Sequence, residues 1–275
     1  MERSRRAGVA IRFDRVVVRF PTPDGGLAAL DEVTLDIPAG GLTAIIGPNG
    51  CGKSTLLRVA AGLLQPTSGG ALVGGVPPVP GDGRVGLAFQ QARLVPWRST
   101  LDNVALPLEV RGVPAAERRE RASGTLAAVG LQDASRLRPG ELSGGMQQRA
   151  ALARALITDP PVLLLDEPFS ALDALTREAF DAELERLWLG ERRTIVLVTH
   201  SVLEAVRLAD HVAVMTPRPG RVARVVEVDL DRPRPPDLGG DRRAAEIAAE
   251  VRATLEEVHP PELAPWLPSE HTVRA

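Results

Sequence analysis

Short apolar runs bounded by Pro and Gly recur in the N-terminal part of the chain and predict β-strands. The β-branched stretches VVVRF (16–20) and VTLDI (33–37) are two of them. A third run, LTAII (42–46), leads directly into a glycine-rich segment, and the pattern after it, STLLRVAAGLL (54–64), is helical. We therefore expect a strand, a glycine-rich loop and a helix in succession.

Strands and helices alternate along the rest of the chain. The further predicted strands are RVGLAF (84–89), VLLLD (162–166), TIVLVT (194–199) and HVAVM (211–215). A helical pattern fills about residues 91–157, and TREAFDAELERLWLG (176–190) predicts a helix between two buried strands. This alternation favours a mainly parallel α/β sheet.

The C-terminal residues 231–275 have a different composition. DRPRPPDLGGDRR (231–243) is rich in Pro, Gly and Arg and predicts a linker. Beyond it, an apolar stripe falls on one helical face, formed by Ile247, Val251, Leu255 and Val258. We expect an amphipathic helix that packs on the sheet or on a partner subunit, with a regulatory role as the alternative.

Composition and charge exclude several classes of protein. The 275 residues are 44% hydrophobic with a net charge of −2, which is typical of a globular protein and gives no basic field for nucleic acid. One cysteine excludes an internal disulfide framework. The apolar runs are far shorter than the roughly 20 residues that span a bilayer. We expect a cytosolic protein, or one held at a membrane only through a partner.

The segment GPNGCGKST matches G-x-x-x-x-G-K-[ST], a phosphate-binding loop, and it has the strand before it and the helix after it that such a loop requires. Its glycines let backbone N–H groups turn toward a phosphate, and the helix presents its N-terminus to the same group. The nucleotide-binding residues predicted here are Gly47, Pro48, Asn49, Gly50, Cys51, Gly52, Lys53, Ser54 and Thr55.

Three side chains of this loop have distinct expected roles. Lys53 is the chain's one lysine among 33 Lys and Arg residues, and its compact ammonium suits the space between the β- and γ-phosphates better than a forked guanidinium. Ser54 offers a hydroxyl to Mg²⁺. Cys51 lies at a helix N-terminus, where the pKa of a thiol can be lowered, so we expect its alkylation by a maleimide to block nucleotide binding.

Two further motifs suggest phosphate chemistry. At the end of the strand in VLLLDEP, Asp166 can hold Mg²⁺ and Glu167 can accept a proton from an attacking water; the alternative is two solvated acids. In LSGGMQQR (142–149), Ser143 and the glycines after it open a helix and form a second anion site, or simply a capped helix.

These motifs, in this order, resemble those of ATP-binding cassette (ABC) transporter ATPases. The resemblance covers about residues 11–222 and includes a Q-loop at FQQ, a D-loop at SALD and VTH ending at His200, although Ser201 stands where the family usually has Asp. It implies an α/β P-loop NTPase (RecA-like) core with an N-terminal antiparallel β subdomain and an inserted helical subdomain at about 91–157. The ATPase domain would span 1–230, followed by the linker and tail of 231–275.

The resemblance also implies that ATP lies between two subunits packed head to tail, most simply a homodimer. Lys53, Ser54 and Asp166 of one subunit would hold the phosphates and Mg²⁺. The signature residues of the other subunit would close on the γ-phosphate; they are Ser143, Gly144 and Gly145.

The remaining family residues act on the water, the base or the dimer. Glu167 would be the general base, and His200 would contact the γ-phosphate and organise the attacking water. Gln90 would reach Mg²⁺ or that water and couple the site to a membrane partner. Asp173 would communicate across the dimer, and Phe20 matches the aromatic residue that stacks on adenine.

Two stretches resemble the ATPases of nitrate, sulfonate and taurine importers: LVPWRSTLDNV (94–104), with Trp97 and Asn103, and TPRPGRV (216–222). We therefore expect the ATP-hydrolysing subunit of an importer for a small anion, at the cytoplasmic face of the membrane. It would dock through 91–157 on an integral membrane permease that is served by an extracytoplasmic solute-binding protein.

The rival class is a soluble ABC ATPase that acts on nucleic acid or ribosomes. Such proteins usually contain two cassettes or a long coiled-coil insertion, whereas this sequence has one phosphate loop, no long heptad stretch and no basic patch. An exporter half would have a fused membrane domain. We expect no nucleic-acid partner. The sequence does not name the transported solute. The alternative that this is the ATPase of an importer for another solute class stays open.

Overall fold

The computed structural model describes residues 8–23, 26–168, 184–186, 188–190, 192–235 and 237–259. Its centre is a six-stranded sheet of order β5-β6-β7-β3-β8-β9, with parallel pairing from β5 to β8 and antiparallel pairing of β8 with β9. The strands are β3 (Leu42–Ile46), β5 (Val85–Ala88), β6 (Val162–Asp166), β7 (Thr194–Val198), β8 (His211–Met215) and β9 (Val222–Glu227).

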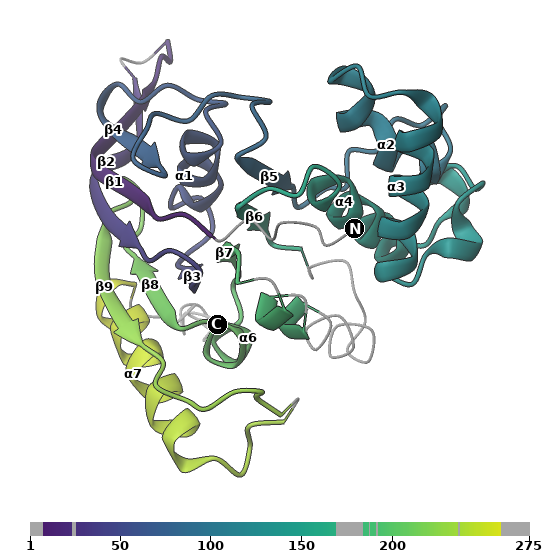
Figure 1. Cartoon of the computed structure of the whole chain (residues 1–275). Helices are drawn as coiled ribbons and strands as arrows, with labels where there is room; N and C mark the ends of the chain where they lie inside the picture. The colour runs from purple at the N-terminus through teal and green to yellow at the C-terminus, as the bar shows by residue number, and fades with distance from the viewer. Residues whose placement is uncertain are drawn as a thin grey trace, which may run out of the picture.

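A second, three-stranded antiparallel sheet of order β2-β1-β4 lies at one side of the molecule (Figure 1). It consists of β1 (Ile11–Phe20), β2 (Leu27–Ile37) and β4 (Ser68–Val73). The helix α1 (Lys53–Ala60) packs with this sheet against one face of the central sheet, in a shared apolar core. The predicted fold class, an α/β core with an N-terminal antiparallel β subdomain, is confirmed.

The inserted helices form a group on the opposite side of the molecule (Figure 1). They are α2 (Thr100–Val110), α3 (Ala115–Ala128) and α4 (Gly144–Leu156), with short 3-10 turns at Gln132–Ala134 and Pro139–Glu141. The helical pattern predicted for 91–157 is therefore interrupted, and the segment before α2 is irregular. α2 begins where the Ser99 side chain caps it by accepting a hydrogen bond from the backbone N–H of Asp102.

Alternate residues of the central strands enter two different cores. Leu163, Leu165 and Leu197 face the helical side, whereas Leu164 and Val196 face α1 and the antiparallel sheet. A parallel sheet that is covered on both faces has strands that are apolar throughout, which explains the uninterrupted run VLLL.

The C-terminal helices cover the sheet near β8 and β9. α7 (Arg242–Val258) packs against α6 (Val202–Leu208), β8 and β9, with Ile247 and Val251 fully buried. The sequence predicted that this amphipathic helix packs on the sheet or on a partner subunit. In the structure it packs on the sheet. Among the described residues, no helix is both long enough and apolar enough to cross a bilayer.

The predicted linker before α7 is anchored to the core by two arginines. Arg232 forms ion pairs with Glu185 at 2.9 Å and Asp210 at 2.8 Å and stacks over the ring of Trp188. Arg234 is only 4% exposed, and its pKa falls to about 10 because of burial and the charge of Arg232. The guanidinium of Arg234 donates to three carbonyls at the end of α6, those of Val206, Arg207 and Ala209.

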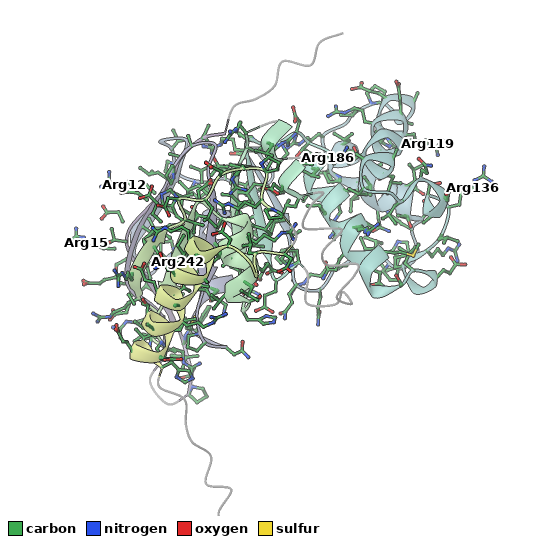
Figure 2. The ribbon with its side chains drawn as sticks, turned by 90° about the horizontal axis from the view of Figure 1, so that it is seen from below. Arg12, Arg15, Arg119, Arg136, Arg186 and Arg242 are labelled. Carbon is green, nitrogen blue, oxygen red and sulfur yellow. The ribbon has the colours of Figure 1, made fainter. Side chains whose placement is uncertain are left out.

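Arginines are spread over the surface of the molecule. Figure 2 shows six that lie on opposite sides of the molecule: Arg12 and Arg15 on β1, and Arg119, Arg136, Arg186 and Arg242 on other segments. This distribution differs from the clustered basic face of a nucleic-acid-binding domain.

Candidate functional site

The phosphate-binding loop connects β3 to α1 in a conformation that needs glycine. Gly50 and Gly52 have φ values of 76° and 106°, in the left-handed region. A Cβ on Gly52 would lie 2.9 Å from the Ala29 carbonyl oxygen, so β2 packs directly on the loop. Among the described residues no side chain caps the N-terminus of α1, and its first N–H groups therefore suit an anion.

Lys53 lies over this loop. Its side chain is 5% exposed, and Nζ donates hydrogen bonds to the carbonyl oxygens of Gly47 at 2.8 Å and Pro48 at 3.0 Å. The ammonium is therefore held at the loop that would receive a phosphate. A buried ammonium on a thin stem fits this position because it needs only a few acceptors at short range.

Cys51 belongs to the loop and is only 1% exposed, and burial raises the pKa of its thiol. The charge of Lys53 and backbone hydrogen bonds lower the pKa, but by less than burial raises it. The sequence-based expectation of a lowered pKa is wrong, because it considered the helix N-terminus and not the apolar core behind it.

We therefore expect Cys51 to resist N-ethylmaleimide in the native protein and to react fully after denaturation. The thiolate is the reacting form, and both burial and the raised pKa reduce its availability. Whole-protein mass measures this directly, since Cys51 is the one cysteine of the chain. Stoichiometric labelling of the native protein at the rate of the denatured protein would contradict the prediction.

The carboxyl ends of adjacent parallel strands gather the polar residues. Gln90 follows β5, Asp166 ends β6 with Glu167 directly after it, and His200 follows β7. On the far side of β7, β3 leads into the phosphate loop. In open α/β sheets ligands bind beyond the carboxyl ends of the strands. The strand order β5-β6-β7-β3 therefore assembles residues that are distant in the sequence.

Three contacts define the acidic centre. Ser54 Oγ donates to Asp166 Oδ1 at 2.9 Å, which joins the phosphate loop to β6. Gln90 Nε2 donates to Glu167 Oε2 at 2.9 Å, and His200 Nδ1 lies 3.8 Å from the same oxygen. The structure thus brings together Gln90, Glu167 and His200 as one group.

The backbone and charges around the acids are unusual. Burial raises the pKa of Asp166, and the charge of Glu167 adds to the increase, while the Ser54 hydrogen bond opposes it. A bound cation would favour the ionised form of this carboxylate, and the serine and aspartate oxygens are ligands that suit Mg²⁺. Glu167 has φ 46°, a costly conformation for a non-glycine residue that is often found at functional sites.

Helix α4 holds the Q-loop, a connection that the sequence reasoning missed. Gln148 Nε2 donates to the backbone oxygen of Gln90. Arg154 donates to the backbone oxygens of Ala92 at 2.7 Å and Arg93 at 2.8 Å. The one feature of the sequence that could have indicated this connection was Gln148, a glutamine within the signature motif LSGGMQQR.

The other predicted residues have simpler surroundings. Ser143 caps α4, since its Oγ accepts from the Met146 N–H at 3.2 Å, and Gly144 and Gly145 form the first turn. Phe20 ends β1 and packs, partly buried, against the apolar core shared by α1 and the antiparallel sheet. Asp173 lies outside the described residues.

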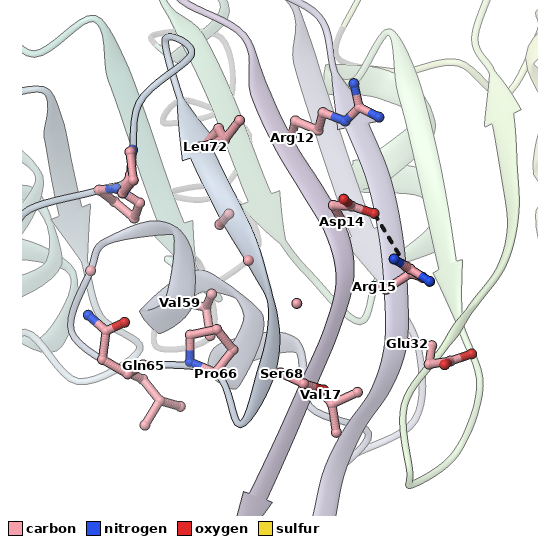
Figure 3. Close-up of a pocket in the computed structure, with 17 residues that line it drawn as sticks. Arg12, Asp14, Arg15, Val17, Glu32, Val59, Gln65, Pro66, Ser68 and Leu72 are labelled. Carbon is pink, nitrogen blue, oxygen red and sulfur yellow. Dashed lines mark ion pairs between the residues drawn. The ribbon is translucent and has the colours of Figure 1, made fainter.

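A separate hollow of about 670 Å³ is lined by residues of β1 and β4, of α1 and of the turn after α1 (Figure 3). Its lining includes Asp14 and Arg15, whose side chains form an ion pair at 3.8 Å, together with Gln65 and Pro66 after α1. The residues that line it include none of those predicted to bind nucleotide. The hollow is therefore distinct from the phosphate site.

The comparison with known families decides the identity of this arrangement. The family model described as ABC transporter matches residues 30–170, which include the phosphate loop, the signature motif and the acidic pair. The chain belongs to the ABC transporter family. It is accordingly an ATP-binding ATPase subunit, as the resemblance implied.

Curated relatives of this ABC protein match most of its length. The aliphatic sulfonates import ATP-binding protein of Mesorhizobium japonicum is 48% identical over 90% of this chain and 87% of its own. The nitrate import ATP-binding protein of Synechococcus elongatus is 43% identical over 88% of this chain and 89% of its own.

A solved structure has the same fold as this ABC protein. It is a dimeric ATP-binding cassette in a post-hydrolysis state, bound to ADP and Pi, with 32% identity and a TM-score of 0.74. The match covers 80% of this chain and 100% of that chain.

Proposed function

We propose that this ABC ATPase is the energy-coupling subunit of an importer for a small anion, either nitrate or a sulfonate such as taurine. The observation that supports its catalytic part most strongly is the group formed by Gln90, Glu167 and His200 beside the phosphate loop. The import function is supported by the names of its relatives. Residues 1–230 would form the ATPase domain and 231–275 the linker and tail.

The residues divide the chemistry among them. Lys53 and the backbone N–H groups at the start of α1 bind the phosphates, and Ser54 and Asp166 hold Mg²⁺, which when bound neutralises phosphate charge. Glu167 accepts the proton of the attacking water. Gln90 orients Glu167, because its amide donates a hydrogen bond to the carboxylate. His200, whose Nδ1 lies 3.8 Å from the same oxygen, would contact the γ-phosphate and organise the attacking water.

The second half of the site comes from a second copy of the chain. Ser143, Gly144 and Gly145 of that copy would approach the γ-phosphate at the N-terminus of α4. The dimeric form of the related cassette supports this assembly. Because α4 also holds the Q-loop through Gln148, closure on the phosphate would be transmitted to Gln90.

The permease would dock beside the Q-loop, where a rigid segment presents Trp97. This side chain is 75% exposed. Asn103, which is fully buried, accepts from the Val95 N–H and donates to the carbonyls of Val95, Arg98 and Ser99. An exposed tryptophan on a fixed backbone is a typical anchor of a protein interface.

We expect Trp97→Ala to lose the permease in a pull-down of tagged protein from native membranes, while ATP affinity is unchanged. Truncation of such an anchor typically costs 2 kcal/mol or more, or about 30-fold in affinity. Leu63→Ala, which removes an exposed apolar side chain in the turn after α1, is the matched control.

The same experiment tests the proposed function. Recovery of a multi-span permease with the unmodified protein supports import, and its binding protein can then be screened with nitrate and sulfonates. Recovery of ribosomes or nucleic-acid enzymes in its place would reject import and leave the ATPase chemistry intact.

A further inference from the structure

We propose that the turn at residues 216–221, TPRPGR, positions the phosphate-binding loop, and that Gly220 sets the affinity of the chain for ATP. The turn connects β8 to β9 and comes from a distant part of the sequence. This inference rests on the phosphate loop being the nucleotide site.

Gly220 packs directly on the loop backbone. A Cβ at this position would lie 3.1 Å from the carbonyl carbon of Cys51 and closer still to its oxygen. These are backbone atoms, which cannot rotate away as a flexible side chain would. Any larger residue at position 220 must therefore displace the turn or the loop.

The turn is itself fixed to β2. Gly220 N–H donates to the Ala29 oxygen at 3.0 Å, and the Gly220 oxygen accepts from the Asp31 N–H at 3.0 Å. Arg221 forms an ion pair with the Asp31 carboxylate. The backbone of Ala29 also lies against Gly52, so β2 contacts both the turn and the phosphate loop.

The turn is closed internally as well. Thr216 N–H donates to the Arg221 oxygen at 2.9 Å, and Thr216 Oγ1 accepts from the Arg221 N–H at 3.0 Å. Before the turn, Met215 is fully buried and its carbonyl oxygen would lie 2.9 Å from a Cβ on Gly47. The phosphate loop is thus packed between the 215–220 backbone and β2.

The contact between Gly220 and Cys51 lies next to the groups that are expected to bind phosphate. Cys51 is adjacent to Gly52 and Lys53, whose N–H groups and ammonium are expected to bind phosphate. A shift of the Cys51 carbonyl turns these donors away from their ligand. Gln90, Glu167 and His200 follow other strands and keep their arrangement, so ATP binding is affected more than the chemical step.

Gly220→Ala is expected to raise the KM and Kd for ATP by about 10- to 100-fold, since small misplacements of binding groups have effects of this size, and to change kcat much less. Gly124→Ala is the matched control, because a Cβ there meets open space on α3. Melting of the nucleotide-free proteins establishes that both are folded. A purely structural role would lower the melting temperature and leave the KM of the folded protein unchanged.

A charge exchange gives an independent readout if Gly220→Ala does not fold. Arg221→Asp should raise the KM by about two- to five-fold, as for an exposed ion pair. Combining it with Asp31→Arg should restore the KM. The proposal is overturned if Gly220→Ala folds and keeps the native KM for ATP. If Gly220→Ala does not fold, a native KM for ATP in Arg221→Asp overturns it instead. Failure of the unmodified protein to bind ATP would overturn the proposed function as well.

Discussion

Replacing Glu167 by Gln is expected to reduce the rate of ATP hydrolysis by about 10²- to 10⁴-fold, the range that general-base catalysis contributes. ATP binding should remain intact. The substituted amide has nearly the same shape as the carboxylate and can still accept the hydrogen bond that Gln90 donates to Oε2 of Glu167. It cannot take a proton from water at neutral pH. The variant should therefore bind ATP and accumulate as an ATP-trapped dimer.

Single-turnover hydrolysis and size-exclusion chromatography with ATP measure these two effects separately. Glu120→Gln is a suitable control, because Glu120 is an exposed carboxylate on α3, away from the acidic group. Native single-turnover rates in Glu167→Gln would exclude Glu167 as the base. Loss of ATP binding in the same variant would instead assign the carboxylate to nucleotide binding.

Replacing Lys53 by Arg should weaken ATP binding at least about ten-fold, even though the positive charge is retained. The Lys53 ammonium is buried and donates to the Gly47 and Pro48 carbonyls. A planar guanidinium is larger and has its donors in a fixed fork, so it overpacks the loop or points at the wrong oxygens. The loss would show that the site selects shape as well as charge.

The reverse exchange on the same helix provides the control. Arg58 is exposed on α1, and Arg58→Lys should leave affinity unchanged. Binding of a fluorescent ATP analogue, together with the melting temperature of each variant, separates nucleotide affinity from folding. Equal affinity in Lys53→Arg and the native protein would refute the shape argument and leave only the charge.

Strands that appear in the sequence as one continuous apolar run were predicted well. The bounds of β3, β6 and β8 agree with the predicted strands, because a strand buried on both faces appears in the sequence as a nearly continuous hydrophobic run. β4 and β9 were missed. β4 begins with SGG and β9 is largely exposed, so neither has the continuous apolar pattern of a central strand.

Side-chain environments were predicted less well. The sequence placed Cys51 at a helix N-terminus but gave no measure of the core behind it, and the pKa shift has the opposite sign. Composition predicted a linker around Arg232 and Arg234, because Pro, Gly and Arg are typical of loops. Their carboxylate and carbonyl partners lie on segments distant in the sequence.

The sequence by itself determined the motifs of this protein, namely a phosphate loop, an acidic pair and a signature motif, because each consists of neighbouring residues. Only the tertiary structure decided which of these residues meet. Strand order brings Gln90 and His200 to Glu167, and the packing of β2 places Gly220 on the phosphate loop. The physical reason is that strand order and burial depend on contacts between segments far apart in the chain, which local patterns do not specify.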